Sequence, residues 1–385
     1  MICWVTIAMP KNNAFTHQRY SPEEPISNWQ LLQPAEPPAA GSAQYEQQMR
    51  AAGDACRDWG VQAIWLIHGT FAGDDPLGLV RSLDSVAPQT ARSWRQLNKR
   101  LLDKLAQDSG NYTSPYAVEF QRAAGIPVER VAWSGENHHL ARADAAVCLL
   151  DRLAAAAGNV KDRVLLWGHS HAGNVLALLS NLLAADSVSR EVFFEAAHCY
   201  YRRGWFGGAG RPVWERVRQW LETPPAQRRL PHLDFVTFGT PIRYGWDTDG
   251  YAQLLHFVYH RPRPGLPPYL TALPRSVEEV RHATGGDYVH QLGIAGTNLT
   301  FAGCAWRPFL ADRRLSRLLQ GGIRQRDLLR RLAIGQRVPQ EGTTLLVEYP
   351  DGTAARQLAG HAIYTRSSWL AFHAAEVARR FYGGG

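Results

Sequence analysis

The sequence predicts an α/β fold, with a mostly parallel central sheet flanked by helices and a helical insertion that is a candidate lid. Short apolar runs alternate with stretches that repeat apolar residues at helical spacing, which is typical of strands joined by helices. The runs are almost continuously apolar, which indicates strands buried on both faces, as in parallel sheets. Hydrophobic residues make up 45% of the 385 residues, enough for a large core.

The predicted elements start after a Pro-rich N-terminal segment, residues 1–60, in which prolines interrupt regular structure apart from one short helix at Gln44–Cys56. Residues 61–385 are expected to form one domain. Strands are expected at Val61–Ile67, Val128–Trp133, Arg163–Trp167, Asp234–Phe238, Leu254–Tyr259 and Thr343–Glu348. Helices are expected at Ala141–Ala157, Gly173–Ala185 and Arg366–Phe381.

Two segments interrupt this alternation. Residues 186–231 are an aromatic-rich helical insertion, the candidate lid, whose rings would either cover an apolar acyl pocket or form a second small core. These rings are Phe193, Phe194, Tyr200, Tyr201, Trp205 and Phe206. Residues 306–340 carry nine arginines on a helical leucine pattern. This pattern favours a solvated helix face, but it also suits docking on anionic lipid or on a partner protein.

Charge, hydropathy and the N-terminal sequence argue against a nucleic-acid-binding protein, a membrane-spanning protein and a protein with a cleaved secretory signal. The formal net charge is +8, and all but four of the 42 basic residues are arginine. The sequence has no zinc-finger spacing, RNP motif or long basic tail, so we do not expect nucleic-acid binding. No run approaches the ~18 apolar residues of a membrane helix. Met1–Met9 lacks the features of a secretory signal peptide, so we expect a cytoplasmic protein or one exported without a cleaved Sec signal.

Metal ions and cofactors are not expected. The five cysteines are far apart and form no CxxC pair, which favours reduced, mostly buried thiols. Asn137, His138 and His139 follow a predicted turn, but two adjacent histidines are not a tetrahedral ligand set. We expect this segment to be a loop that lines a pocket.

The strongest chemical signal is GHSHAG at 168–173, which lies directly between a predicted strand and a predicted helix. A serine on such a sharp turn points outward above the carboxyl edge of the sheet, and the helix N-terminus stabilises negative charge that develops there. Ala172 stands where the pattern G-x-S-x-G has its second glycine, but alanine is still small. Ser170 is therefore the predicted nucleophile.

A second signal is HGTF at 68–71, at the end of the first core strand. The backbone N–H of Thr70, or less favourably that of Phe71, would donate to an oxyanion together with the N–H of His171. His68 is expected to shape this loop rather than to move protons. The side chains of Phe71, His169 and His171 are expected to line the substrate pocket.

A serine nucleophile needs a general base, because its hydroxyl is a poor nucleophile at neutral pH. The chain order serine, acid, histidine favours His361, in a loop before the closing helix, over His373 within that helix. The predicted acid, which would orient the imidazole, is Asp287 in GGDYV. Asp247 is the alternative acid.

These segments together resemble the α/β-hydrolase superfamily, in particular bacterial lipases. The matching segments run in the same order through residues 60–385: IHGTF at 67–71, WGHSHAG at 167–173, VTFGTPI at 236–242, GDYV at 286–289 and GHAIY at 360–364. WSGEN at 133–137 and GHSHAGN at 168–174 are similar to lipase effectors exported by type VI secretion. The resemblance implies the α/β-hydrolase fold, supports Asp287 and His361 as acid and base, and implies phospholipid or acylglycerol ester substrates. It also implies export without a cleaved signal and an immunity or carrier protein as partner.

We therefore expect a serine carboxylester hydrolase, a lipase or phospholipase that works through Ser170, His361, Asp287 and an acyl-enzyme. Its partners would be a lipid or other ester and a membrane surface. One alternative is a short-chain esterase or acyltransferase. The other is a binding module that keeps the scaffold without activity.

Overall fold

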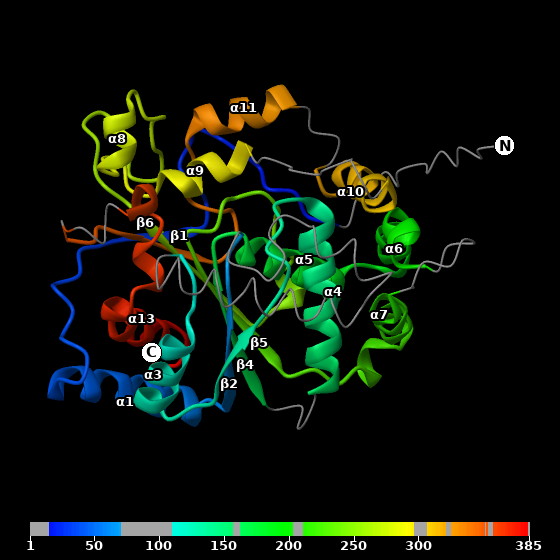
Figure 1. Cartoon of the computed structure of the whole chain (residues 1–385), viewed down its shortest axis with the longest axis horizontal. Helices are drawn as coiled ribbons and strands as arrows, with labels where there is room; N and C mark the ends of the chain where they lie inside the picture. Colours follow the sequence, from blue (N-terminus) through cyan, green and yellow to red (C-terminus); the bar gives the residue numbers. More distant parts are fainter. Residues whose placement is uncertain are drawn as a thin grey trace.

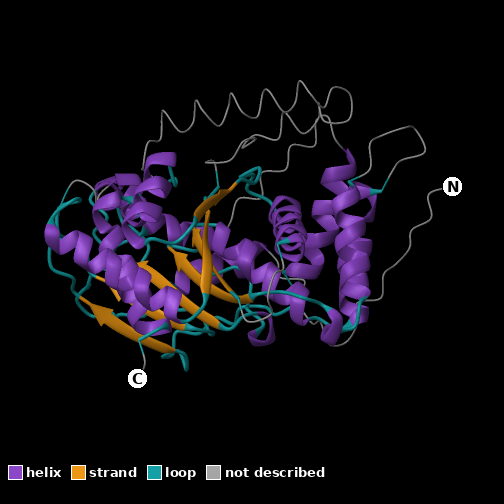
Figure 2. Ribbon diagram, turned by 90° about the horizontal axis from the view of Figure 1, so that it is seen from below, coloured by secondary structure: helices purple, strands orange, loops and turns teal. Residues whose placement is uncertain are grey.

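A seven-stranded sheet forms the centre of the computed structural model (Figures 1 and 2). The structure describes residues 15–70, 110–156, 162–202, 211–295, 306–320, 325–350, 352 and 357–383. The strands are β1 (Asn28–Leu32), β2 (Val61–Ile67), β3 (Val128–Val131), β4 (Arg163–His169), β5 (His232–Phe238), β6 (Gln253–Tyr259) and β7 (Thr343–Val347). Their order is β1-β7-β6-β5-β4-β2-β3, and every neighbouring pair is parallel. The predicted α/β class is confirmed.

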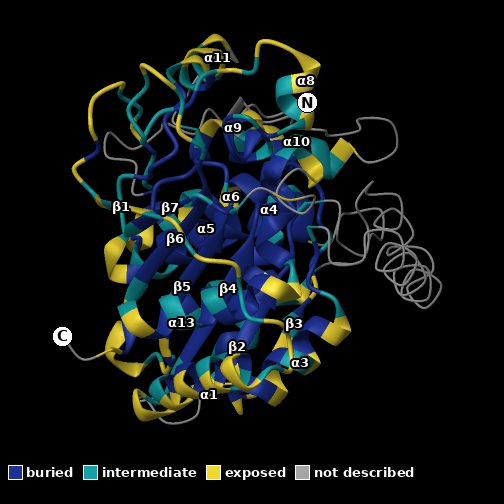
Figure 3. Ribbon diagram, turned by 90° about the vertical axis from the view of Figure 1, so that its left-hand side faces the viewer, coloured by how far each residue is buried: buried dark blue, intermediate teal, exposed yellow. Residues whose placement is uncertain are grey.

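Helices cover both faces of the sheet, as a parallel sheet requires. One face packs against α1 (Ala43–Asp58), α3 (Ser114–Ala124) and α13 (Leu370–Phe381). The other face is covered by α4 (His139–Ala155) and α5 (Ala172–Ala184). Outside them, α6 (Ser187–Tyr201), α7 (Pro212–Glu222) and α10 (Trp306–Leu319) pack on α4 and on one another (Figure 1). Strand β2 serves both cores, because Ile64 and Leu66 face the first group and Trp65 and Ile67 the second. Figure 3 shows the buried strands between helices whose outer sides are exposed.

Three further helices, α8 (Val277–Arg281), α9 (Tyr288–Ala295) and α11 (Gln325–Ile334), lie together near one end of the sheet (Figure 1). Helix α9 packs on α11, and both α8 and α9 contact the short 3₁₀ turn at Gln357–Gly360. The exposed side chains of the Arg-rich segment include Arg313 and Arg317 on α10 and Arg326 and Arg330 on α11. These four arginines therefore lie on solvated helix faces.

Strand β1 corrects the expectation that residues 10–60 contain no regular element besides one helix. Its sequence, NWQLL, lies in the proline-free stretch between Pro25 and Pro34 and pairs with β7 at the edge of the sheet. An edge strand is half exposed and need not be a continuous apolar run, so the pattern that identified the central strands missed it. The predicted helix at Gln44–Cys56 is present as α1.

The aromatic insertion is a packed helical layer in its described part. Phe193, Phe194 and Tyr201 are at most 2% exposed, and their rings, with that of Tyr200, surround Trp214 of α7. Of the two alternatives for these four rings, the small core is the one observed. Trp205 and Phe206 lie outside the described residues.

The chain changes direction across the sheet between β2 and β4. From β2 the chain adds β3 on one side, and from β4 it adds β5, β6 and β7 on the other. In open parallel sheets, ligands bind in the crevice at the carboxyl ends of the strands where this reversal occurs. The loops that follow β2 and β4 are therefore the first place to look for a functional site.

Two remaining observations concern the whole chain. None of the described helices is long and apolar enough to cross a membrane. Of the three described cysteines, Cys56 is buried, Cys199 is partly buried and Cys148 is exposed.

Candidate active site

Ser170 occupies a strained turn between β4 and α5. Its φ is +57°, in the left-handed region that few residues other than glycine adopt, and such strain is often kept at functional sites. Its N–H donates to Phe238 O at 2.8 Å, and its carbonyl accepts from Thr240 Oγ1 at 2.8 Å. A Cβ at Gly173 would lie 2.1 Å from Thr240 Oγ1, so the turn requires glycine at position 173. Position 172, where the pattern G-x-S-x-G has its second glycine, accommodates alanine.

The loop after β2 meets this turn. A Cβ at Gly69 would lie 2.7 Å from Ser170 Cβ, so only glycine allows the two backbones to approach this closely. Thr70 follows Gly69, and His171 follows Ser170. The two predicted oxyanion donors thus belong to adjoining loops at the switch point of the sheet. Phe71 lies outside the described residues.

His68 holds the loop after β2, as predicted. Its Nε2 accepts from Trp133 N–H at 3.3 Å, so the proton is on Nδ1, which donates to Gly69 O at 2.8 Å. Trp133 Nε1 in turn donates to His68 O at 2.7 Å, and the two rings stack. These bonds occupy both ring nitrogens of His68 with backbone groups.

His361 and Asp287, far apart in the chain, lie together beside Ser170. His361 Nδ1 donates to Asp287 Oδ2 at 2.7 Å. Gly239 follows Phe238, whose carbonyl accepts from Ser170 N–H. A Cβ at Gly239 would lie 3.0 Å from His361 Cε1, so His361 packs against the strand end that holds Ser170. Ser170 Oγ and His361 Nε2 are not hydrogen-bonded to each other, and Nε2 is buried without a partner. Ser170 itself is 6% exposed. Such bonds are often loose without substrate.

Asp287 is held by three hydrogen bonds in a buried position. Besides His361, Tyr364 OH donates to Oδ2 at 2.9 Å, and His290 N–H donates to Oδ1 at 2.8 Å at the start of α9. Burial alone would raise the pKa of Asp287, but the charge and hydrogen bond of His361 and the bond from His290 outweigh burial and lower it. The carboxylate is therefore ionised at neutral pH and opposite the imidazole.

The loop that carries His361 is also strained. Leu358, Ala359 and Gly360 have φ values of +48°, +53° and +91°, three left-handed residues in a row. A Cβ at Gly360 would lie 2.7 Å from Gly286 O, next to Asp287. The loop thus approaches the acid turn closely, and His361 N–H closes it by donating to Leu358 O at 3.0 Å.

Two histidines flank Ser170 in sequence. The ring of His169 lies 4.6 Å from that of His361, centroid to centroid, and burial together with His361 lowers the pKa of His169 to about 3. His171 Nδ1 lies 3.1 Å from Asn174 Nδ2, and burial with the charges of Arg142 and Arg243 lowers its pKa well below the usual value. Both rings are therefore neutral walls of the site.

The alternative acid, Asp247, is not brought to His361. Its carboxylate accepts from Asp249 N–H at 3.2 Å and begins the 3₁₀ turn Thr248–Gly250, while its own N–H donates to Ser180 Oγ, three turns along α5. Asp247 thus caps its own turn. His373, the base not favoured by chain order, is buried in α13 with Nε2 2.7 Å from Tyr349 OH.

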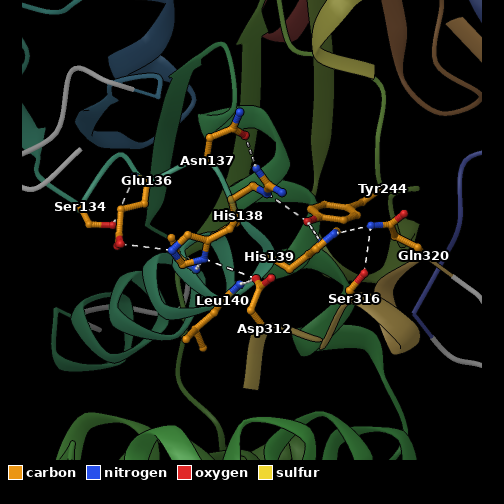
Figure 4. A network of polar contacts seen from close by, with 12 residues as sticks. Ser134, Glu136, Asn137, His138, His139, Leu140, Tyr244, Asp312, Ser316 and Gln320 are labelled. Atoms are coloured by element: carbon orange, nitrogen blue, oxygen red, sulfur yellow. Dashed lines mark hydrogen bonds and ion pairs between the residues drawn. The ribbon is translucent and has the colours of Figure 1, made fainter. Parts of the chain in front are cut away.

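The segment Asn137–His139 joins a buried polar network at the start of α4 (Figure 4). His138 Nδ1 accepts from Ala141 N–H at 3.0 Å and caps the helix, while Nε2 faces Glu136 at 3.1 Å. His139 Nδ1 lies 2.7 Å from Tyr244 OH. The described residues contain no group of three or more metal-ligating side chains. Each of these two histidines therefore has hydrogen-bond partners at both ring nitrogens.

Sequence analysis missed several residues of the site. Tyr364 was part of the quoted GHAIY segment but received no role, and the contribution of His290 is a backbone N–H that any residue could supply. Thr240, which fixes the Ser170 carbonyl, follows β5 in the quoted VTFGTPI segment. The sequence offered one signal for each side chain: Tyr364 lies three residues after the predicted base His361, and Thr240 lies just after the end of a predicted strand.

The arrangement provides a buried serine hydroxyl in a strained turn, an imidazole hydrogen-bonded to a carboxylate, the Thr70 N–H in the loop after β2 and the His171 N–H at the start of α5. This combination suits attack on a carbonyl carbon followed by stabilisation of an oxyanion. Comparison of the chain with protein-family models, with curated proteins and with solved structures finds no match.

Proposed function

We propose that the protein is a serine carboxylester hydrolase of the α/β-hydrolase superfamily. The observation that carries the proposal is the His361–Asp287 hydrogen bond next to the left-handed turn of Ser170, where the His361 ring packs on that of His169, the residue before Ser170. The strand order supports the superfamily assignment, because the serine follows the central strand β4, next to the strand that precedes Thr70.

In the proposed mechanism His361 Nε2 takes the proton of Ser170 Oγ as the hydroxyl attacks the ester carbonyl. The oxyanion accepts from the N–H groups of Thr70 and His171. His361 then protonates the leaving alcohol, and water cleaves the acyl-enzyme by the same route in reverse. Asp287 stays ionised and stabilises the imidazolium, a role that fits its lowered pKa.

The substrate class is proposed as acyl esters of lipids, on the resemblance to lipases. The exposed arginines of α10 and α11 would favour an anionic lipid surface as the place where substrate is met. Rates on esters of increasing acyl length, measured with and without lipid vesicles, separate a lipase from a short-chain esterase: a lipase gains from chain length and from the interface.

The central test is Ser170→Ala. We expect loss of ester turnover by at least ~10³-fold with an unchanged circular dichroism spectrum, because no other group can replace the nucleophile. A fluorophosphonate should label the wild-type chain on Ser170 and leave the variant unlabelled. Retained turnover in Ser170→Ala, or a wild-type chain that resists labelling, would refute the mechanism and favour an inactive binding module.

A further inference from the structure

Arg337 is a buried cation behind the acid of the candidate site. It is 2% exposed and follows α11, where its backbone N–H donates to Tyr269 O at 3.1 Å. Its Nη2 donates to Gly285 O at 2.9 Å, and its Nη1 lies 2.8 Å from His260 Nδ1. One guanidinium thus joins the end of β6 to the turn that carries Asp287.

Backbone contacts hold the same turn against the end of β6. Asp287 N–H donates to Tyr259 O at 3.1 Å, and Gly286 pairs with His260 in an isolated antiparallel bridge. A Cβ at Gly286 would lie 2.3 Å from Tyr259 O, so the turn lies flat against the strand end. Arg337 adds a side-chain donor to this turn, at the Gly285 carbonyl.

The charge of Arg337 is not neutralised by a carboxylate contact. Arg337 forms no ion pair within the part of the chain that the structure describes. Burial lowers the pKa of Arg337 to about 10, and nearby Tyr364 and Asp287 oppose this shift, so the guanidinium stays charged at neutral pH. Burial and Arg337 together lower the pKa of His260 to about 3, so His260 is neutral and can accept at Nδ1.

We propose that Arg337 is a positioning residue for the candidate active site, resting on the proposed hydrolase function. It fixes the Gly285–Asp287 turn through the Gly285 carbonyl, and it places a permanent positive charge behind the Asp287 carboxylate. The positive charge offsets part of the negative charge that Asp287 presents to His361 Nδ1. Arg337 therefore acts on His361 through both the position and the charge of Asp287.

The test compares two variants that separate the hydrogen bond from the charge. Arg337→Gln keeps a donor but removes the charge, and Arg337→Lys keeps the charge but loses the planar fork. With a soluble short-chain ester, we expect the acidic limb of kcat/KM against pH to move up by about 0.5 unit or more in Arg337→Gln, since His361 is then more easily protonated. In Arg337→Lys the limb should stay at the wild-type position while kcat falls severalfold.

A matched control is Arg163→Met, which removes a half-buried arginine from the buried Asp234 at the opposite end of the sheet. It should lower the melting temperature without moving the limb. An unmoved limb in a folded Arg337→Gln, or a wild-type kcat in Arg337→Lys, overturns the proposal. If Arg337→Gln does not fold, the lysine variant decides alone by its kcat. If Ser170→Ala retains turnover, the proposed hydrolase function is refuted together with the role of Arg337. If Ser170→Ala is inactive while both arginine variants match the wild type, only the proposed role of Arg337 is refuted.

Discussion

At the scale of single residues, two buried tyrosines make the same contact at opposite ends of the sheet. Tyr364 OH donates to Asp287 Oδ2 at 2.9 Å, and Tyr382 OH donates to Asp234 Oδ2 at 2.8 Å. Only the first carboxylate contacts an imidazole; the second pairs with Arg163. Comparing variants of Tyr364 and Tyr382 therefore separates the effect of a tyrosine hydroxyl on stability from its effect on the candidate active site.

We expect Tyr382→Phe to lower the free energy of unfolding by about 1–2 kcal/mol, since Asp234 loses one hydrogen bond. Tyr364→Phe should lower it somewhat more, because Tyr364 OH also accepts from Tyr259 N–H at 2.7 Å. Only Tyr364→Phe should lower kcat, by roughly tenfold, because Asp287 then orients His361 less firmly. Urea unfolding and ester turnover of both variants measure the two effects. Equal loss of activity in the two variants would mean that Tyr364 acts only through stability.

At the scale of elements, the central strands were predictable and the edge and loops were not. β4, β5 and β6 are buried over nearly their whole length, so their apolar runs were visible in the sequence. β1 escaped because an edge strand needs no such run. Ser170 and His361 could be proposed from the sequence, because a strand-to-helix turn is a local signal and the order of residues along the chain favoured His361. The choice between Asp287 and Asp247 needed the tertiary structure, since both lie in loops after strands.

The turn after β5 tests how tightly these loops are packed. Gly239 has a φ of +56°, and its added Cβ would lie 2.6 Å from Asp287 Oδ2 and 2.5 Å from Tyr364 Cε2. We expect Gly239→Ala to displace the acid and lower turnover at least ~10²-fold. Gly265→Ala is the control, because Gly265 has a φ of +78° but no atom within 4 Å of its Cβ position. It should cost only ~1 kcal/mol of stability from backbone strain and leave turnover intact. Similar activities in the two variants would show that the loop relaxes around the methyl group.

At the scale of the whole molecule, burial of neutral histidines couples the fold to pH. In the described chain, burial lowers the pKa of His17, His139, His169, His171, His256, His260, His290 and His373. Values of about 3 or 4 for five of them lie far below the ordinary value near 6.5. Glu341 acts in the opposite direction, because burial raises its pKa to about 7.

The sign of the effect follows from where the protons bind. Between pH 6.5 and 4.5 the unfolded chain protonates these imidazoles and the folded chain does not, so stability is fully present above pH 6.5 and is lost as the pH falls. Each histidine contributes up to ~1.4 kcal/mol per pH unit in this window. Glu341 offsets about one of them, and Asp234 and Asp247, whose pKa values burial also raises, act in the same direction as Glu341. We therefore expect the free energy of unfolding, from urea titrations at pH 7.5, 6.0 and 5.5, to fall by several kcal/mol before most carboxylates titrate. His373→Phe should reduce the slope of the free energy of unfolding against pH by the contribution of about one histidine, because the phenyl ring fills the same buried position on α13 and does not titrate. A free energy that stays level down to pH 5 would mean that the buried imidazoles gain partners on protonation that the neutral fold does not use.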